Sequence, residues 1–133
     1  MYWLVKSEPE TYSFVQLLAE GRAIWDGVRN PQAQRYLRQM AVGEEVLYYH
    51  TGRERAIVGL ARVRQAAFPE PGHPDYWAVE LEGVRPLRRP VSLAVIRTQP
   101  QFQDIPLLRQ PRLSVMPIPE ALWEWVLEWE RSG

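Results

Sequence analysis

Hydrophobic and polar positions along the chain predict short strands mixed with helices. Residues 2–6 are mostly bulky and apolar, which indicates a first strand. Ser13 and Gln16 have the spacing of a capping box, so a helix is expected to begin there and to end at Gly21. Asn30 followed by Pro31 predicts the start of a second helix, because proline suits the first helical position.

The same patterns predict the rest of the chain. They predict an end to the second helix at Gly43, strands at 45–50, 56–67 and 76–87, a loop at 69–74, a short helix from Ser92 to about Arg97, an irregular stretch at 99–111, a strand at 114–116 and a last helix at 119–130. The strands cluster in the middle and are joined by short turns. This arrangement indicates an α+β protein whose antiparallel sheet can close into a small barrel.

Composition limits the classes of protein to which the chain can belong. A chain of 133 residues with 46% hydrophobic residues fits one domain with a real core. No apolar run approaches the roughly 18 residues that span a membrane, and the N-terminal residues lack the pattern of a signal peptide. With no cysteine, neither a disulfide nor a thiolate metal site is expected, and the cytoplasm is the expected compartment.

The formal net charge is zero, which argues against a dedicated high-affinity binder of duplex DNA. Lys6 is the only lysine, so the other 15 of the 16 basic residues are arginines. Arginine suits phosphate contacts and stacking, but a GC-rich genome explains the bias more simply. Twelve prolines and no cysteine are a compositional hint of a thermophile.

The segment from Trp25 to Pro31 concentrates side chains suited to binding a planar heterocycle. It places an indole, a carboxylate, a glycine, a guanidinium and an amide within six positions. An indole offers a face for stacking, and glycine lets a backbone approach a ligand closely. The simpler interpretation is a core tryptophan followed by a turn and a capped helix, and the pattern alone favours it.

The sequence gives little support to an enzymatic function. Two histidines, His50 and His73, are too few for the usual three or four protein ligands of zinc. Phosphate-binding, dinucleotide-binding and nucleophile-elbow glycine motifs do not occur. One arrangement stays open as a minor alternative, a hydrolytic triad that joins Ser7 or Ser114 to His50 and Asp26.

Several short motifs occur together and in order along nearly the whole chain. They are residues 2–9 (YWLVKSEP), 25–30 (WDGVRN), 43–50 (GEEVLYYH), 58–59 (VG), 89–93 (RPVSL) and 112–117 (RLSVMP). Through this combination the chain resembles the EVE domain family, a branch of the PUA-like superfamily. The resemblance implies a single domain over residues 1–133. Its expected fold is an α+β pseudo-barrel of about five to six mixed or antiparallel strands, flanked by helices.

The resemblance also implies a function. Domains of this type bind RNA or DNA, and EVE domains are linked to recognition of modified cytosines in DNA. A non-enzymatic reader of an extruded modified base is therefore expected, with no cofactor and no metal. Because the chain is neutral, binding should be weak with a shallow dependence on salt. Pro31 stands where relatives often carry an aromatic residue, which leaves the preferred base open.

The site is expected where the end of the first strand, the Trp25–Asn30 loop, the strand ending at His50 and the segment 112–116 meet. Trp25 would stack on the base, at roughly 1–3 kcal/mol per contact, unless it only fills the core. The other expected base-binding residues are Ser7, Glu8, Asp26, Gly27, Val28, Asn30, Tyr48, His50 and Ser114. Those expected to bind phosphate are Lys6, Arg29 and Arg112.

Simpler roles exist for these residues. Asn30 can serve only as a helix cap, Tyr48 can belong to the core, and the serines can satisfy local backbone groups. Three rival functions also stay open. They are an RNA-binding module in RNA modification, a sensor of a small nucleotide-like ligand, and, with less support, the hydrolase described above.

Overall fold

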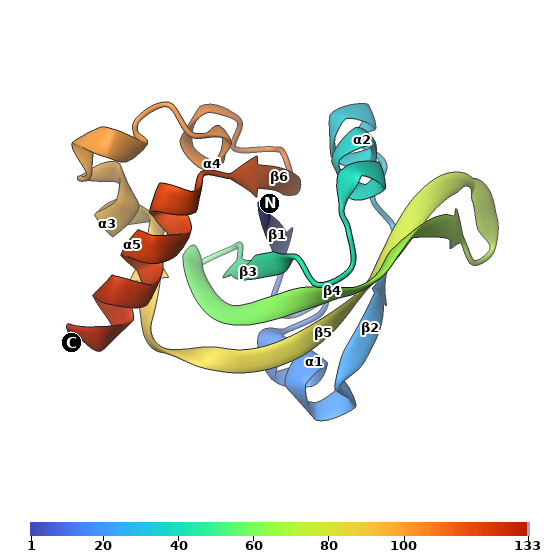
Figure 1. Ribbon diagram of the computed structural model, residues 1–133, viewed down its shortest axis with the longest axis horizontal. Helices are drawn as coiled ribbons and strands as arrows, with labels where there is room; N and C mark the ends of the chain where they lie inside the picture. The colour runs from blue at the N-terminus through green and yellow to red at the C-terminus, as the bar shows by residue number, and fades with distance from the viewer. Residues whose placement is uncertain (133) are drawn as a thin grey trace.

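Six strands form one curved sheet at the centre of the protein, whose computed structural model describes residues 1–132 (Figure 1). They are β1 (Tyr2–Ser7), β2 (Arg22–Trp25), β3 (Glu45–His50), β4 (Ala56–Glu70), β5 (His73–Ser92) and β6 (Val115–Ile118). Their order across the sheet is β2-β5-β4-β3-β1-β6. β1 and β3 are parallel and the other neighbours are antiparallel. The edge strands β2 and β6 do not pair, so the sheet is an open, mixed pseudo-barrel, which confirms the expected fold class.

Helices pack around this sheet. They are α1 (Phe14–Glu20), α2 (Pro31–Gln39), α3 (Leu93–Arg97), α4 (Pro106–Arg109) and α5 (Glu120–Arg131), with a 3₁₀ turn, η1, at Pro100–Phe102. In Figure 1, α3, α4 and α5 lie together at one end of the sheet, whereas α1 and α2 lie toward the other end. Within residues 1–132, no helix combines the length and the apolar character needed to cross a membrane.

Local sequence explains the first two helices. The Ser13 side chain accepts a hydrogen bond from the Gln16 N–H while the Gln16 side chain accepts one from the Ser13 N–H, so the predicted capping box is confirmed. The Asn30 side chain accepts from the Ala33 N–H at 3.0 Å and caps α2. The second helix ends at Gln39, so the predicted end at Gly43 is wrong, and residues 41–43 turn into β3.

β1 runs through the middle of the core. Trp3, Leu4 and Val5 are all fully buried, although successive side chains of a strand point to opposite faces. Both faces of β1 are therefore covered. On the face toward α1, Tyr48 is fully buried against Phe14, with ring centroids 5.1 Å apart. On the other face, Tyr2 stacks on Trp123 of α5 at 5.0 Å.

The predicted loop at 69–74 is wrong. β4 continues to Glu70 and β5 begins at His73, so the two strands form one long hairpin whose end projects from the sheet (Figure 1). Gly72 supplies the turn with φ +82°. Pro69 is tolerated here because this part of β4 pairs with β5 alone, which leaves the missing N–H without a required acceptor.

Other elements were not predicted. β2 is only four residues long and pairs with a single neighbour, β5, so its own sequence pattern is weak. The stretch at 99–111 holds η1 and α4, which are too short for a helical period to show. Strands and helices at the remaining positions match the predictions to within a few residues, except that β5 runs on to Ser92.

Candidate functional site

Trp25 lies at the end of edge strand β2, where the chain leaves the sheet. Its backbone pairs with Val79 of β5. The indole is 9% exposed and meets two tyrosine rings edge-on, Tyr48 at 5.5 Å and Tyr12 at 6.3 Å. These contacts fix the plane of the indole, so Trp25 is both a core residue and part of the surface described below.

The loop after Trp25 is held by a carboxylate far away in the sequence. Glu70, 3% exposed, accepts hydrogen bonds from the Gly27 N–H at 2.8 Å and from both outer nitrogens of Arg29 at 3.0 and 2.7 Å. The guanidinium carbon of Arg29 also lies over the Tyr76 ring, 4.0 Å from its centre. Arg29 lowers the pKa of Glu70 to about 2, with help from the Gly27 N–H. The loop is therefore clamped to the β4–β5 hairpin.

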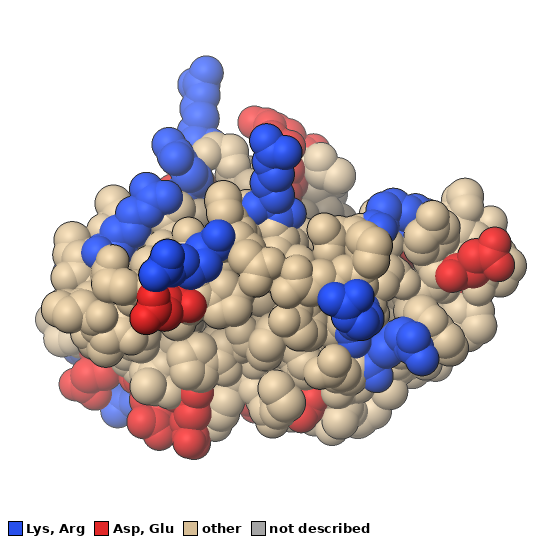
Figure 2. Space-filling view, turned by 90° about the horizontal axis from the view of Figure 1, so that it is seen from above, with Lys and Arg blue, Asp and Glu red and all other residues tan. Residues whose placement is uncertain are grey.

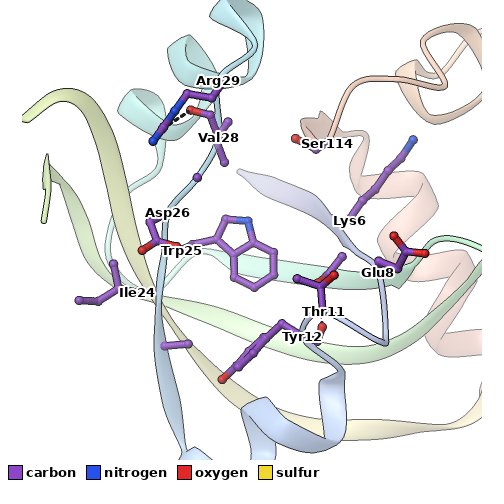
Figure 3. Close-up of a pocket in the computed structure, with 13 residues that line it drawn as sticks. Lys6, Glu8, Thr11, Tyr12, Ile24, Trp25, Asp26, Val28, Arg29 and Ser114 are labelled. Carbon is purple, nitrogen blue, oxygen red and sulfur yellow. Dashed lines mark hydrogen bonds between the residues drawn. The ribbon is translucent and has the colours of Figure 1, made fainter. Parts of the chain in front are cut away.

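A cavity of about 510 Å³ opens beside the indole (Figure 3). We call it the Trp25 cavity. It is lined by Lys6, Ser7, Glu8, Thr11, Tyr12, Ala23, Ile24, Trp25, Asp26, Gly27, Val28, Arg29 and Ser114. These residues come from three separate parts of the chain, which meet where the two edges of the curved sheet approach each other. The volume lies within the range of about 300–1,000 Å³ typical of small-molecule sites.

Polar groups with no protein partner face this cavity. Among the hydrogen bonds formed within residues 1–132, none uses the indole N–H of Trp25 or the side chains of Asp26 and Ser114 (Figure 3). Figure 3 shows the indole between Val28 and Ser114 on one side and Thr11 and Tyr12 on the other. The cavity thus offers the indole ring with its N–H donor, carboxylate acceptors and a hydroxyl at Ser114 that has no protein partner in the described chain.

The two tyrosines that contact the indole are uncharged and held by hydrogen bonds. The Tyr48 hydroxyl donates to the Tyr12 carbonyl at 2.9 Å, and burial raises the pKa of Tyr48 to about 12. The Ser7 hydroxyl donates to the same carbonyl at 2.7 Å. The Tyr12 hydroxyl donates to Glu20 at 2.5 Å; burial first, and then Glu20, raises the pKa of Tyr12. Trp25 therefore rests on uncharged rings at neutral pH.

Nine of the predicted site residues line the cavity and four do not. The four outside it are Asn30, Tyr48, His50 and Arg112. Asn30 uses its side-chain oxygen to cap α2. Tyr48 is fully buried beneath the indole and supports it from below. Arg112 is exposed in the turn before β6.

His50 does not form the triad that the sequence left open. Its Nε2 accepts a hydrogen bond from the Phe14 N–H at 3.0 Å, and its Nδ1 lies 2.7 Å from the Glu54 carboxylate. Ser7 pairs with His50 across β1 and β3, but its hydroxyl points to Tyr12. Both ring nitrogens are therefore occupied, and His50 serves to anchor the start of α1.

Two of the three cations predicted to hold phosphate, Arg29 and Lys6, line the cavity but differ in their contacts. Arg29 gives both outer nitrogens to Glu70, so its charge is paired and its main contact holds the loop. Lys6 is only half-buried, and its ammonium donates to the Pro111 carbonyl at 3.0 Å. Within residues 1–132 no carboxylate lies at ion-pair distance from Lys6. Lys6 is thus the available cation at the cavity.

Five contributors were not predicted. Thr11, Tyr12, Ala23 and Ile24 line the cavity, and Glu70 holds its loop. Tyr12 directly precedes the Ser13 cap, a position from which an apolar side chain commonly packs on the helix. Glu70 lies 43 positions from Gly27, and no local pattern relates the two. Among the described residues, no group of three or more His, Cys, Asp and Glu is placed to hold a metal ion.

Comparison with known protein families shows which family the chain belongs to. The EVE domain profile matches residues 1–129 of the chain. The chain belongs to the EVE domain family. Human thymocyte nuclear protein 1 is 31% identical over a 167-residue alignment that covers 98% of this chain and 74% of the human protein.

Solved structures of relatives agree closely with this EVE domain. A protein from Rhodopseudomonas palustris is 36% identical, with a TM-score of 0.90 over 96% of this chain and 90% of that protein. Human THYN1 protein, solved in complex with DNA containing 5-methylcytosine, is 29% identical, with a TM-score of 0.89 over 97% and 96% of the two chains. An ASCH protein from Zymomonas mobilis, 15% identical with a TM-score of 0.56 over 96% of each chain, shares the fold alone.

Proposed function

We propose that this EVE domain is a non-enzymatic nucleic-acid-binding module that holds an extruded modified base in the Trp25 cavity, with a modified cytosine in DNA favoured. The observation that carries the proposal is the indole of Trp25, fixed by two tyrosines at the wall of a cavity of about 510 Å³. The relative solved with DNA containing 5-methylcytosine supports the choice of base.

The polar groups of the cavity fit cytosine better than thymine. Cytosine presents an exocyclic amine, a donor, where thymine presents a carbonyl oxygen. Asp26 and Glu8 are acceptors at the cavity, and the indole N–H is a donor suited to the carbonyl of the same ring. Extruding a base costs a few kcal/mol, which stacking at roughly 1–3 kcal/mol and these hydrogen bonds would offset.

Binding to matched oligonucleotides tests the proposal. Single- and double-stranded DNA and RNA would carry one plain, methylated or hydroxymethylated cytosine, with plain and methylated adenine as further arms. We expect tighter binding to one modified cytosine strand. Trp25→Phe keeps a ring but removes the N–H and part of the stacking area, so that preference should fall about tenfold. Equal binding across the panel would contradict a base reader.

Two further variants separate loss of binding from loss of folding. Trp25→Ala removes a buried side chain and should cost about 3–5 kcal/mol of stability, so its binding is informative only below its melting temperature. Trp129→Phe is the matched control, because Trp129 stacks on Arg89 at the opposite end of the molecule and lines no part of the cavity. It should bind like the unaltered protein.

The non-enzymatic part of the proposal rests on the occupied nitrogens of His50. Mass spectrometry of oligonucleotides after long incubation with the protein should find them unchanged, and a released base or a cut strand would contradict this part. Our expectation of a cytoplasmic location is a separate proposal, to be tested by fractionation of the source cells.

A further inference from the structure

Three arginines without an ion-pair partner among the described residues gather next to α3. Arg53, Arg55 and Arg97 line a second hollow of about 270 Å³ next to α3. In the described chain none of the three lies at ion-pair distance from a carboxylate. Glu54 also lines this hollow, but its carboxylate is taken by His50 at 2.7 Å.

Outside this hollow, six arginines of the described chain lie at ion-pair distance from a carboxylate and six do not. The paired ones include Arg62 with Glu45, Arg64 with Glu80 and Arg109 with Asp104. What distinguishes this hollow is that three arginines without an ion pair line the same small surface. Figure 2 shows Lys and Arg side chains standing across one face of the molecule, whereas most Asp and Glu side chains lie toward its edges.

Tyr49 connects this hollow to the cavity. The Lys6 ammonium lies 5.6 Å from the centre of the Tyr49 ring, and Lys6 also lines the Trp25 cavity. Burial raises the pKa of Tyr49, and the charges of Arg55 and Arg97 lower it in part. Lys6 therefore lines the Trp25 cavity and also contacts Tyr49, and the charges of Arg55 and Arg97 act on the same ring.

Arg55 is held in an unfavourable backbone conformation. Its φ of +43° makes it the one non-glycine residue with positive φ among residues 1–132. Glycine or asparagine would adopt this conformation at lower cost. The Arg55 carbonyl accepts a hydrogen bond from the Leu93 N–H at 2.8 Å, which needs only backbone. The backbone conformation therefore does not explain why arginine stands at this position.

We propose that Lys6, Arg55 and Arg97 form a phosphodiester-binding subsite for the nucleic-acid strand whose base enters the Trp25 cavity. The proposal rests on the function proposed above. Guanidinium groups suit phosphate because their planar fork matches its oxygens. Burial lowers the pKa of the Lys6 ammonium, and an approaching phosphate would favour its charged form. The subsite would set the path of the strand and would carry no base preference.

Salt-dependent binding of three variants tests this subsite. Arg55→Gly and Arg97→Gln should each weaken binding about fivefold, equally for modified and plain strands, and should lower the slope of log affinity against log salt by about one. Arg55→Gly should also melt at the same or a higher temperature, because it relieves the strained backbone. Arg22→Gln is the control, since Arg22 is exposed at the start of β2 and has no ion-pair partner among residues 1–132. It should leave the slope unchanged.

The outcomes separate the two proposals. Unchanged affinity and slope in both subsite variants would overturn the subsite while leaving base selectivity intact. Equal binding of modified and plain strands, with a slope that the variants still reduce, would overturn the base reader and keep the subsite. Absence of binding to every strand at low salt overturns both.

If Arg55→Gly fails to fold, Arg55→Gln removes the charge and keeps a side chain at this position. Competition by polyglutamate as strong as that by DNA would assign the surface to an acidic protein instead.

Discussion

Glu70 shows how one buried side chain can organise a loop that it does not adjoin in sequence. Its two oxygens receive three donors, two from Arg29 and one from the Gly27 backbone. A carboxylate with this many charge-assisted partners is held in one orientation. The loop that carries Trp25 and Asp26 is thereby fixed against the hairpin before any ligand arrives.

Replacing Glu70 by glutamine should lower stability in a pH-dependent way. The variant leaves Arg29 without its counter-charge, so we expect a loss of about 1–3 kcal/mol at pH 7. The folded protein keeps Glu70 ionised down to about pH 2, whereas an ordinary glutamate takes up its proton near 4.5. The unfolded state therefore binds more protons in this interval, and the stabilisation by Glu70 is lost as pH falls from about 4.5 toward 2.

Chemical denaturation of both proteins from pH 7 to pH 2 measures this effect. The difference in unfolding free energy between the unaltered protein and Glu70→Gln should be full above pH 5 and should shrink toward pH 2. Glu82→Gln is a suitable control, because Glu82 is more exposed and lies 3.6 Å from Arg64. A difference that stays constant over the whole range would show that the ionisation of Glu70 does not couple to folding.

At the scale of elements, Gly59 decides how closely α1 can approach the sheet. A Cβ atom added at Gly59 would lie 2.3 Å from the Phe14 ring, so Phe14 packs directly on bare backbone of β4. α1 follows the Tyr12 segment that forms the floor of the cavity. The position of the cavity floor therefore depends on a glycine two strands away from it.

Gly59→Ala should destabilise the protein by about 1–3 kcal/mol, because the Phe14 ring must move out of a packed site. Phe14→Leu should cost a similar amount by leaving space unfilled. In the double variant the smaller side chain makes room for the new methyl group, so we expect a smaller loss than the sum of the two. Thermal or denaturant unfolding of the four proteins gives the coupling, and simple additivity would contradict direct packing of Phe14 on Gly59.

Sequence patterns predicted the elements that are determined locally. The capping box at Ser13 and the cap at Asn30 depend on residues three positions apart, and both are confirmed. β2 and the end of the hairpin were missed because each owes its strand geometry to its partner β5 rather than to its own residues. Prolines in the hairpin predicted a loop because their tolerance depends on having only one neighbouring strand.

The candidate site likewise has a part that local sequence predicted and a part that depends on distant residues. The Trp25 loop was visible in sequence because its chemistry is concentrated in consecutive residues. Where those side chains point depends on distant groups, and the sequence alone could not show that Arg29 pairs with Glu70 or that His50 anchors α1. The roles of the cavity residues in binding a base stay predictions until the variants are measured.

At the scale of the whole molecule, the long β4–β5 ribbon is fastened at both ends in the same way. At one end Glu70 binds Arg29 and the Gly27 N–H. At the other end Glu130 of α5, also nearly buried, binds both outer nitrogens of Arg85 at 3.0 and 2.6 Å and the Arg88 N–H at 2.9 Å. Arg85 lowers the pKa of Glu130. One clamp faces the cavity and the other holds the last helix.

The two clamps should contribute separately to stability and differently to binding. Glu130→Gln should cost about 1–3 kcal/mol, as Glu70→Gln does. Because the end of the β4–β5 hairpin and the last turn of α5 lie far apart in Figure 1, the losses should add in the double variant to within about 0.5 kcal/mol. Only Glu70→Gln frees the Trp25 loop, so it alone should weaken binding of the preferred modified strand, whereas Glu130→Gln should bind normally below its melting temperature. Equal loss of binding in both variants would mean that the cavity depends on the stability of the whole sheet and not on its own clamp.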